Sequence, residues 1–425
     1  METSPANKDM LTDRPPDSTH ALTGNFWKLW SANSFSNLGD GLYQVTLPLL
    51  AAGLTRSPSL IALLGVMFSL PWLIFALQAG SIVDHSDRRK VMLWVNSGRI
   101  IILSALTLAV IGGYLSLPIL YVVALLLGMG ETLVDTALTS IVPSVVAKDR
   151  LTWANARITG AQTVTNTFLG PPLAGYLAGA GFAIAAGSST ILYIAAGIAL
   201  LWMRGSFHAS TQVDQPIKPQ GWRHVTEGLR FLWKDRLIRD LTLFTASMNL
   251  FWSGWGALIV LYAVTPGPMG LSTSQYGIFL TAMAIGGLLG SAVCARLEKS
   301  IGTRNALALD FVGTSLLVGV PALTSNPFAV GAAAFFAGAG ATVWVILVAS
   351  IRQRRVPGEL LGRVYSASRF ISWGIGPIGA LLAGFIAEVW GIRVMFAMGG
   401  IASIGLLLLF LRLIPLQTID AVGNK

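Results

Sequence analysis

Hydrophobic residues along the chain gather in long runs that short polar segments separate. Twelve runs stand out, at residues 27–54, 59–83, 91–113, 117–142, 157–180, 183–203, 241–264, 275–296, 305–323, 327–351, 364–389 and 394–413. A helix needs about 20 apolar residues to cross a bilayer, and each run has about that length. The pattern therefore predicts an all-α integral membrane protein with 12 transmembrane helices.

The polar segments between the runs predict how the chain is divided. We expect a disordered cytosolic tail at 1–25, a six-helix bundle at 26–204, a central cytoplasmic linker at 205–238, a second six-helix bundle at 239–414 and a cytosolic tail at 415–425. Within the linker, residues 222–233 form an amphipathic patch with Trp and Phe for the lipid and Arg for the headgroups, which is typical of a helix lying at the membrane surface.

Composition agrees with a membrane protein and excludes several other classes. The chain is 54% hydrophobic and 11% charged, whereas soluble proteins carry about 25% charged residues. The single cysteine, Cys294, rules out a disulfide framework. No Walker A motif, nucleophile motif or metal-binding Cys/His cluster occurs, so we expect no enzyme, no catalytic residue, no metal and no cofactor.

Charge in the loops predicts the orientation in the membrane. The net charge of +10 does not require a nucleic-acid partner, because the basic residues concentrate on one side of the predicted bilayer. The only basic residues in the loops on the other side are Arg56 and Arg393. Basic residues are kept in the cytoplasm, so we expect a multi-pass protein of the plasma (inner) membrane with both termini inside.

The two halves of the chain also contain similar sequence segments. The segment that begins Gly170-Pro171-Pro172 recurs at Gly376, and the pair Gly80-Ser81 recurs at 290–291, with offsets near 206 to 210 residues. Related six-helix halves are typical of secondary transporters, whose binding site lies at the interface between the halves.

The polar hinge between the second and third runs resembles a loop of the major facilitator superfamily. That loop follows the pattern Gly-x-x-x-Asp-(Arg/Lys)-x-Gly-(Arg/Lys)-(Arg/Lys), which Gly80, Asp84, Arg88 and Arg89 match, while His85 and Asp87 depart from it. The resemblance spans about residues 27–413. It implies the major facilitator fold, in which these residues latch the two halves together in the outward-open state.

Within the superfamily, the chain is similar to the branch of macrolide and enterobactin exporters. The resemblance rests on Gly39-Asp40-Gly41 followed by Pro48, on the stretch from Pro143 to Ala156, and on the glycine-proline element Gly170, Pro171, Pro172 and Gly175 in the fifth run. It implies a monomeric antiporter that exports drug-like amphiphilic compounds in exchange for protons by alternating access. A kink that serves only helix packing remains the alternative for the glycine-proline element.

Three acidic residues inside the predicted bilayer are the main candidates for chemistry. Asp40 and Glu131 lie about halfway along their runs, and Asp135 follows Glu131 by one helical turn on the same face. A charged Asp at a helix centre costs roughly 2.5–3.5 kcal/mol, so it needs a partner, a water-filled cavity or a proton. Proton and cationic substrate then compete for the carboxyl, as an antiporter requires. A structural carboxyl bonded to a neighbouring helix remains the alternative.

Four further residues complete the predicted site. Arg99 can pair with Asp40 or Asp135, or extend to the interface. Asn249, Trp252 and Trp255 are cavity candidates because their run borders the interface between the halves. Two other functions stay open: export of a siderophore or another endogenous metabolite, and a sensor of transporter origin that moves nothing. Acidic residues in the interior favour a cationic substrate over an anionic one.

Overall fold

The computed structural model describes residues 18–147, 150–205, 207 and 221–414. The predicted C-terminal tail, most of the predicted N-terminal tail and much of the linker lie outside these residues. The described chain is helical: α1 (Ser18–Leu54), α2 (Pro58–Ile74), α3 (Ala76–Asp84), α4 (Arg88–Ile111), α5 (Leu117–Val145), α6 (Leu151–Gln162), the π-helix η2 (Thr163–Leu169), α7 (Gly170–Ala180), α8 (Phe182–Leu201), α9 (Gly221–Lys234), α10 (Arg236–Ala263), α11 (Thr273–Leu323), α12 (Pro327–Arg355), α13 (Gly358–Gly374), α14 (Gly376–Trp390) and α15 (Ile392–Leu413).

Side chains with oxygen acceptors define where several helices begin. Ser57 accepts from the backbone of Leu60 at the start of α2, and Asn326 does the same for the first turn of α12. At α11, Ser272 and Gln275 form a reciprocal capping box. Each cap satisfies N–H groups that the helix itself leaves unpaired. These caps therefore fix where α2, α11 and α12 begin.

Each of the 12 predicted runs lies mainly in helix, although those at 91–113 and 183–203 extend two residues past the ends of α4 and α8, and the all-helical class is confirmed. Eight helices of the described chain are long and apolar enough to cross a membrane, and the pair α2 and α3, bent by 57°, would make a ninth. Helix α11 contains two predicted runs and changes direction at Gly302, whose φ of 79° favours glycine. The count of 12 spans stays a prediction. Helix α1 begins at Ser18, inside the predicted tail.

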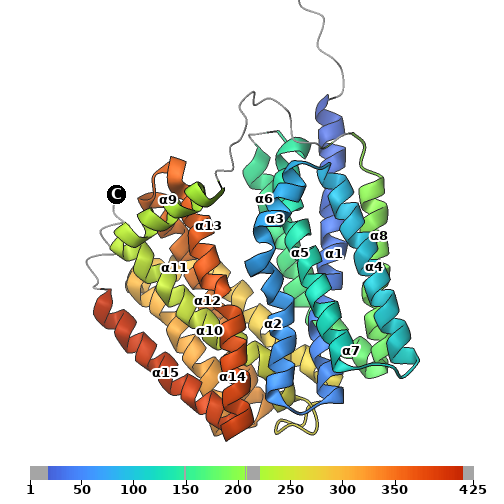
Figure 1. The fold of residues 1–425 in the computed structure, drawn as a ribbon. Coiled ribbons are helices and arrows are strands. Elements are labelled where there is room, and N and C mark those ends of the chain that lie inside the picture. The colour runs from blue at the N-terminus through green and yellow to red at the C-terminus, as the bar shows by residue number, and fades with distance from the viewer. Residues whose placement is uncertain (1–17, 148–149, 206, 208–220, 415–425) are drawn as a thin grey trace, which may run out of the picture.

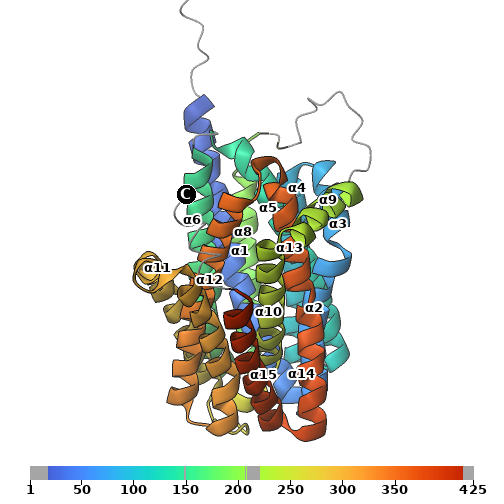
Figure 2. The same cartoon turned by 90° about the vertical axis from the view of Figure 1, so that its left-hand side faces the viewer.

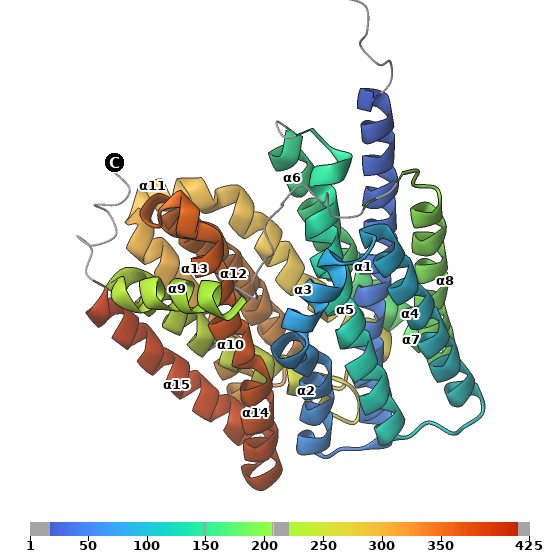
Figure 3. The same ribbon diagram turned by 45° about the horizontal axis from the view of Figure 1, so that its top comes forward.

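Helices α1–α8 form one bundle and α10–α15 form the other (Figure 1). The helices run along a common long axis, as the second view shows (Figure 2). The bundles meet at the end that carries residues 55–57 and 264–272, which we call the closed end. Toward the opposite end, where α9 packs on α13, the two sets of helices diverge (Figure 3). We call this the α9 end.

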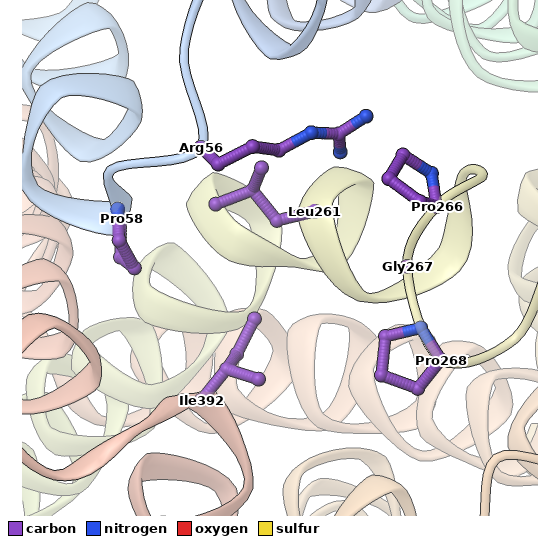
Figure 4. A pocket seen from close by; sticks show the side chains of 7 residues that line it. All are labelled: Arg56, Pro58, Leu261, Pro266, Gly267, Pro268 and Ile392. Atoms are coloured by element: carbon purple, nitrogen blue, oxygen red, sulfur yellow. The ribbon is translucent and has the colours of Figure 1, made fainter.

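Polar contacts join the two bundles at the closed end. Glu388 of α14 accepts from Ser57 Oγ at 2.7 Å and from Ser59 N at 3.2 Å, so it caps the first turn of α2 in the other bundle. Arg56 Nη2 donates to the carbonyl of Thr265 at 3.1 Å. Both bundles also line a small surface pocket of about 360 Å³ beside this contact, formed by Arg56, Pro58, Leu261, Pro266, Gly267, Pro268 and Ile392 (Figure 4).

Glycines let the bundles approach closely near the closed end. A Cβ on Gly277 of α11 would lie 2.5 Å from the Pro171 carbonyl oxygen and 3.0 Å from Gly175 Cα, both in α7 of the other bundle. No real side chain tolerates such distances to backbone atoms. Small residues serve this purpose in membrane proteins, where close van der Waals packing replaces the hydrophobic effect between helices.

Replacing Gly277 with alanine is therefore expected to force α7 and α11 apart. Overpacking typically costs about 1–3 kcal/mol, and about 1.4 kcal/mol reduces the population of the closed arrangement about tenfold. Spin labels at Leu60→Cys and Val389→Cys, in a Cys294→Ser background, should report a longer distance between α2 and α14. Gly256→Ala is the matched control, since a Cβ there meets no atom within 4 Å. An unchanged distance in Gly277→Ala would contradict the packing argument.

Candidate functional site

A buried cluster of ionisable side chains lies inside the first bundle. It joins Asp40 of α1, Arg99 of α4 and Glu131 of α5. Arg99 Nη1 lies 3.3 Å from Asp40 Oδ1, and Nη2 lies 3.4 Å from Glu131 Oε2. The side chain of Arg99 is 2% exposed, that of Asp40 is 5% exposed and that of Glu131 is 19% exposed. Three predicted site residues thus form one network, with Arg99 shared between two carboxyls.

Hydroxyl groups complete the cluster. Tyr193 of α8 donates to Asp40 Oδ1 at 2.5 Å, and Tyr43 of α1 donates to Glu131 Oε2 at 2.8 Å. The Arg99 guanidinium donates to Ser36 Oγ at 3.1 Å and lies 5.1 Å from the centroid of the Tyr193 ring. Four transmembrane helices therefore hold two acids and one base in a fixed arrangement of hydrogen bonds.

The glycines around Asp40 explain how α1 carries an acid so deep in the bundle. A Cβ on Gly39 would lie 3.2 Å from the Tyr193 ring, and a Cβ on Gly41 would lie 2.5 Å from the carbonyl oxygen of Asn166 in η2. Asp40 can therefore reach its partners only because its two neighbours lack side chains. The Gly39-Asp40-Gly41 motif brings α8 and η2 against α1 on either side of the carboxyl.

The charge of the cluster is unbalanced when both acids are ionised. One guanidinium then faces two carboxylates, and the site carries one net negative charge. A buried charge without a partner is costly, because water no longer solvates it. The imbalance is removed by one proton or by one external cation. Glu131 is the more exposed of the two acids, so it is the carboxyl that a ligand can reach more readily.

Asp135 lies one turn along α5 from Glu131 and is half-buried, and Asp40 and Arg99 of the network lie within electrostatic range of it. Arg369 of α13, in the other bundle, is within electrostatic range of Asp135. The Arg369 guanidinium lies 4.8 Å from the ring centroid of Trp72 in α2 and 5.3 Å from that of Trp373 in α13. This cation–π group joins the two bundles where α2 and α13 end. It lies about 20 Å along α2 from the closed end.

The three predicted cavity residues of α10 do not join the acid cluster. Asn249 donates to the carbonyl of Ser372 at 2.7 Å, and Trp252 donates to Thr314 Oγ1 at 3.1 Å, so both bond within the second bundle. Trp255 is buried with its ring 6.4 Å from that of Phe279, and its Nε1 finds no partner among the described residues. Their role in a substrate cavity stays a prediction.

The predicted latch lies at the α9 end, at the junction of α3 and α4. Arg89 donates to the carbonyls of Leu200 and Leu201 at 2.8 and 2.7 Å, which caps the last turn of α8. Asp87, which departs from the family pattern, caps α4 by accepting from the backbone of Arg89 and Lys90. Asp84 is exposed, and its part in a latch stays a prediction. Gly80 lies in α3, and Arg88 begins α4.

The glycine-proline element follows the π-helix η2. Pro171 and Pro172 lack N–H donors, so the regular α-helical bonding cannot continue through them, and the wider turns of η2 precede them. Gly170 packs against Gly41 of α1, and Gly175 packs against Gly277 of the other bundle. The element thus connects the acid-bearing helix α1 to the interface between the bundles.

Sequence reasoning did not identify Ser36, Tyr43 and Tyr193. Ser36 and Tyr43 lie one turn on either side of Asp40 on α1, and that spacing was a usable signal. Tyr193 is an isolated tyrosine in an apolar run 153 residues away, and nothing local in the sequence connects it to Asp40.

Solved structures share this architecture. The nucleoside transporter NupG superposes with a TM-score of 0.73 at 14% identity, covering 92% of this chain and 98% of its own. A bacterial homologue of the iron transporter ferroportin, in an inward-facing state, gives a TM-score of 0.68 at 16% identity and covers 93% of this chain and 99% of its own. At such identities the likeness shows the fold.

Curated relatives are similar along nearly the whole chain. Macrolide efflux protein A of Streptococcus pyogenes is 23% identical over 385 residues, which cover 88% of this chain and 92% of the relative. Multidrug efflux pump Tap of Mycobacterium tuberculosis is 25% identical over 402 residues, which cover 90% of this chain and 91% of the relative. The family model described as transmembrane secretion effector matches residues 21–424. The chain therefore belongs to the transmembrane secretion effectors, a family of multi-pass transporters in the efflux branch of the major facilitator superfamily.

Proposed function

We propose that this protein exports small amphiphilic cations across the plasma membrane in exchange for protons, by alternating access between two six-helix halves. The observation that supports this most strongly is the shared guanidinium of Arg99 between Asp40 and Glu131. This arrangement is neutral when one carboxyl is protonated and carries one net negative charge when both carboxyls are ionised. The relatives named as macrolide and multidrug efflux proteins favour drug-like substrates.

The proposed exchange follows from the geometry of the cluster. Asp40 is the deeper acid and holds Arg99 and Tyr193, so it keeps the guanidinium in place. Glu131 is partly exposed, and it takes the proton that balances the site. A cationic substrate approaching Glu131 favours its ionised form and expels the proton. Because the site accepts one positive charge at a time, substrate and proton bind alternately.

The orientation follows from the loops. The α9 end carries the basic loop segments, including Arg88, Arg89 and Lys90, and basic loops stay in the cytoplasm. The closed end then faces outward, and the described conformation is inward-facing. In the outward-facing state the Glu388 and Arg56 contacts would separate, the α9 end would close, and Asp84 and Arg88 would latch the halves.

The aromatic group between the bundles favours an amphiphilic substrate. Trp72 and Trp373 contribute one ring from each half, and their centroids lie 6.5 Å apart. A flat organic cation can stack on such rings once it displaces the Arg369 guanidinium that lies over them, while Asp135 and Glu131 balance its charge. An anionic siderophore or metabolite, the rival substrate, would instead meet two acids on α5.

Efflux from everted membrane vesicles tests this proposal. With no membrane potential present, vesicles containing the protein should move ethidium and erythromycin when a pH gradient is imposed, and nigericin, which collapses the gradient, should stop the movement. Vesicles without the protein are the control for leakage. Transport that persists unchanged after nigericin would contradict proton coupling. Transport of an anionic siderophore but of neither cation would support the rival substrate.

A further inference from the structure

Similar helix contacts occur in both bundles, and the residues that form them are separated by a nearly constant number of positions in the sequence. In the first bundle a Cβ on Gly170 would lie 2.7 Å from Gly41 Cα, and in the second a Cβ on Gly379 would lie 2.8 Å from Leu250 Cα. Gly379 follows Gly170 by 209 positions in the chain, and Leu250 follows Gly41 by the same number. The contact therefore aligns α1 with α10, and it aligns Asp40 with Asn249.

A second repeated contact aligns α5 with α12. Thr132 Oγ1 donates to the Gly128 carbonyl at 2.9 Å, and Thr342 Oγ1 donates to the Gly338 carbonyl at 3.0 Å. These residues are 210 positions apart, and the register places Ala341 where the first bundle has Glu131. The second bundle therefore lacks counterparts of both acids that pair with Arg99.

Near the position that corresponds to Arg99, the second bundle carries an acid. A Cβ on Gly130 would meet Arg99 Nε at 3.2 Å, and a Cβ on the equivalent Gly340 would meet Asp310 Cα at 2.7 Å. The register of 210 positions places Leu309 at the position of Arg99, and Asp310 is the next residue along the helix. The second bundle thus has no cation at this position, and a carboxyl lies one residue beyond it.

Asp310 has no charged partner within the described chain. The residue is 3% exposed, and its Oδ1 is buried without a hydrogen bond to any described residue. Among described residues, no basic group makes an ion pair with it, and no ionisable side chain of α10, α12 or α15 acts on it electrostatically. Its neighbours along α11, Leu307 and Phe311, belong to the hydrophobic core of the second bundle, and its Cα lies against Gly340 of α12.

A carboxylate without a cation, water or donor is unstable inside a membrane protein, whereas a protonated carboxyl is tolerated there. We propose that Asp310 is a second proton-binding site of the transporter: it takes up a proton in the outward-facing state, carries it into the inward-facing state, and releases it to the cytoplasm there when the helices around it rearrange. The step is a simple protonation, in which the carboxylate takes up one proton and later returns it to water. The inference rests on the proposed exchange of protons for cations.

The inference has a measurable electrical consequence. Glu131 and Asp310 would together carry two protons inward for each monovalent cation carried outward. One net positive charge then moves inward in every cycle, so a membrane potential drives transport even without a pH gradient. With Glu131 alone, one proton would exchange for one cation, and no net charge would move.

Purified full-length protein in proteoliposomes, with ethidium as the substrate, tests this directly. A potential of about 60 mV, set with potassium and valinomycin at equal pH on both sides, should change the steady ethidium gradient of the wild type about tenfold. Asp310→Asn, which mimics the protonated form, should respond to a pH gradient but not to the potential. Asp310→Glu should restore the response to the potential.

Asp240→Asn is the matched control, because that acid of the same bundle is paired with Arg236 and Arg239 at the α9 end of α10. It should behave as the wild type. A wild type that responds to a pH gradient but not to the potential would overturn the second proton site, whatever the variants do. An unchanged potential response in Asp310→Asn would overturn it as well. A wild type that responds to neither gradient would instead overturn the proposed proton coupling.

Discussion

Replacing Arg99 with methionine is expected to cause the largest loss of stability and to abolish transport. The substitution leaves Asp40 and Glu131 buried without their shared cation, and removing one partner of a buried ion pair typically costs about 3–5 kcal/mol. Arg99→Lys should recover only part of this, because an ammonium cannot reach both carboxyls and Ser36 with a planar fork. Thermal unfolding of the purified variants in detergent, followed by tryptophan fluorescence, measures the change.

The control for this experiment is Arg157→Met, which removes an exposed arginine that lies over Trp153 and should change stability by less than about 1 kcal/mol. A triple variant that combines Arg99→Met with Asp40→Asn and Glu131→Gln removes all the charges together. It should regain most of the stability that the single variant loses, since no unpaired charge remains. An Arg99→Met protein as stable as the wild type would contradict the idea that this cation neutralises the buried acids.

Glu131→Gln and Asp40→Asn are expected to eliminate uphill efflux while keeping substrate binding. Each substitution preserves the size of the side chain but removes the acid that balances Arg99, so one proton can no longer enter and leave the site. In everted vesicles the rate of pH-gradient-driven ethidium movement should fall at least about tenfold. This fall corresponds to an increase of about 1.4 kcal/mol or more in the activation free energy of transport. Fluorescence of bound ethidium reports binding separately.

Glu298→Gln serves as the control for the loss of an acid, because Glu298 bonds only to Thr303 at the α9 end among the described residues. It should transport ethidium at the wild-type rate. If Glu131→Gln and Asp40→Asn both retained gradient-driven efflux, these acids would have no part in coupling, although they would keep their place in the buried network.

Much of the fold could be predicted from hydrophobic runs, because the bilayer imposes one length and one polarity on every spanning helix. Where helices bend was harder to predict. The π-helix η2 precedes Pro171 and Pro172, where Gly170 packs against Gly41 of α1, and the kink in α11 lies at Gly302, whose backbone angles are not helical. Such features follow from contacts between distant segments, which local composition does not encode.

The candidate site could also be predicted only in part from the sequence. Asp40, Arg99 and Glu131 could be identified because ionisable residues are rare inside a bilayer. The choice among partners for Arg99 was open, and only the packing of α1, α4 and α5 shows that it contacts Asp40 and Glu131 together. Tyr193 and Arg369 could not be connected to the acids, since they lie on helices that reach the site from remote parts of the chain.

The central claim is that a proton and a cationic substrate compete at Glu131. Ethidium binding to the purified protein, measured across a range of pH, tests this claim most directly. Wild-type affinity should fall as the pH is lowered, because protonation removes a negative charge that attracts the cation. Glu131→Gln should still bind ethidium, with the weaker affinity of the low-pH wild type at every pH. If the variant kept the pH dependence of the wild type, competition at Glu131 would be contradicted.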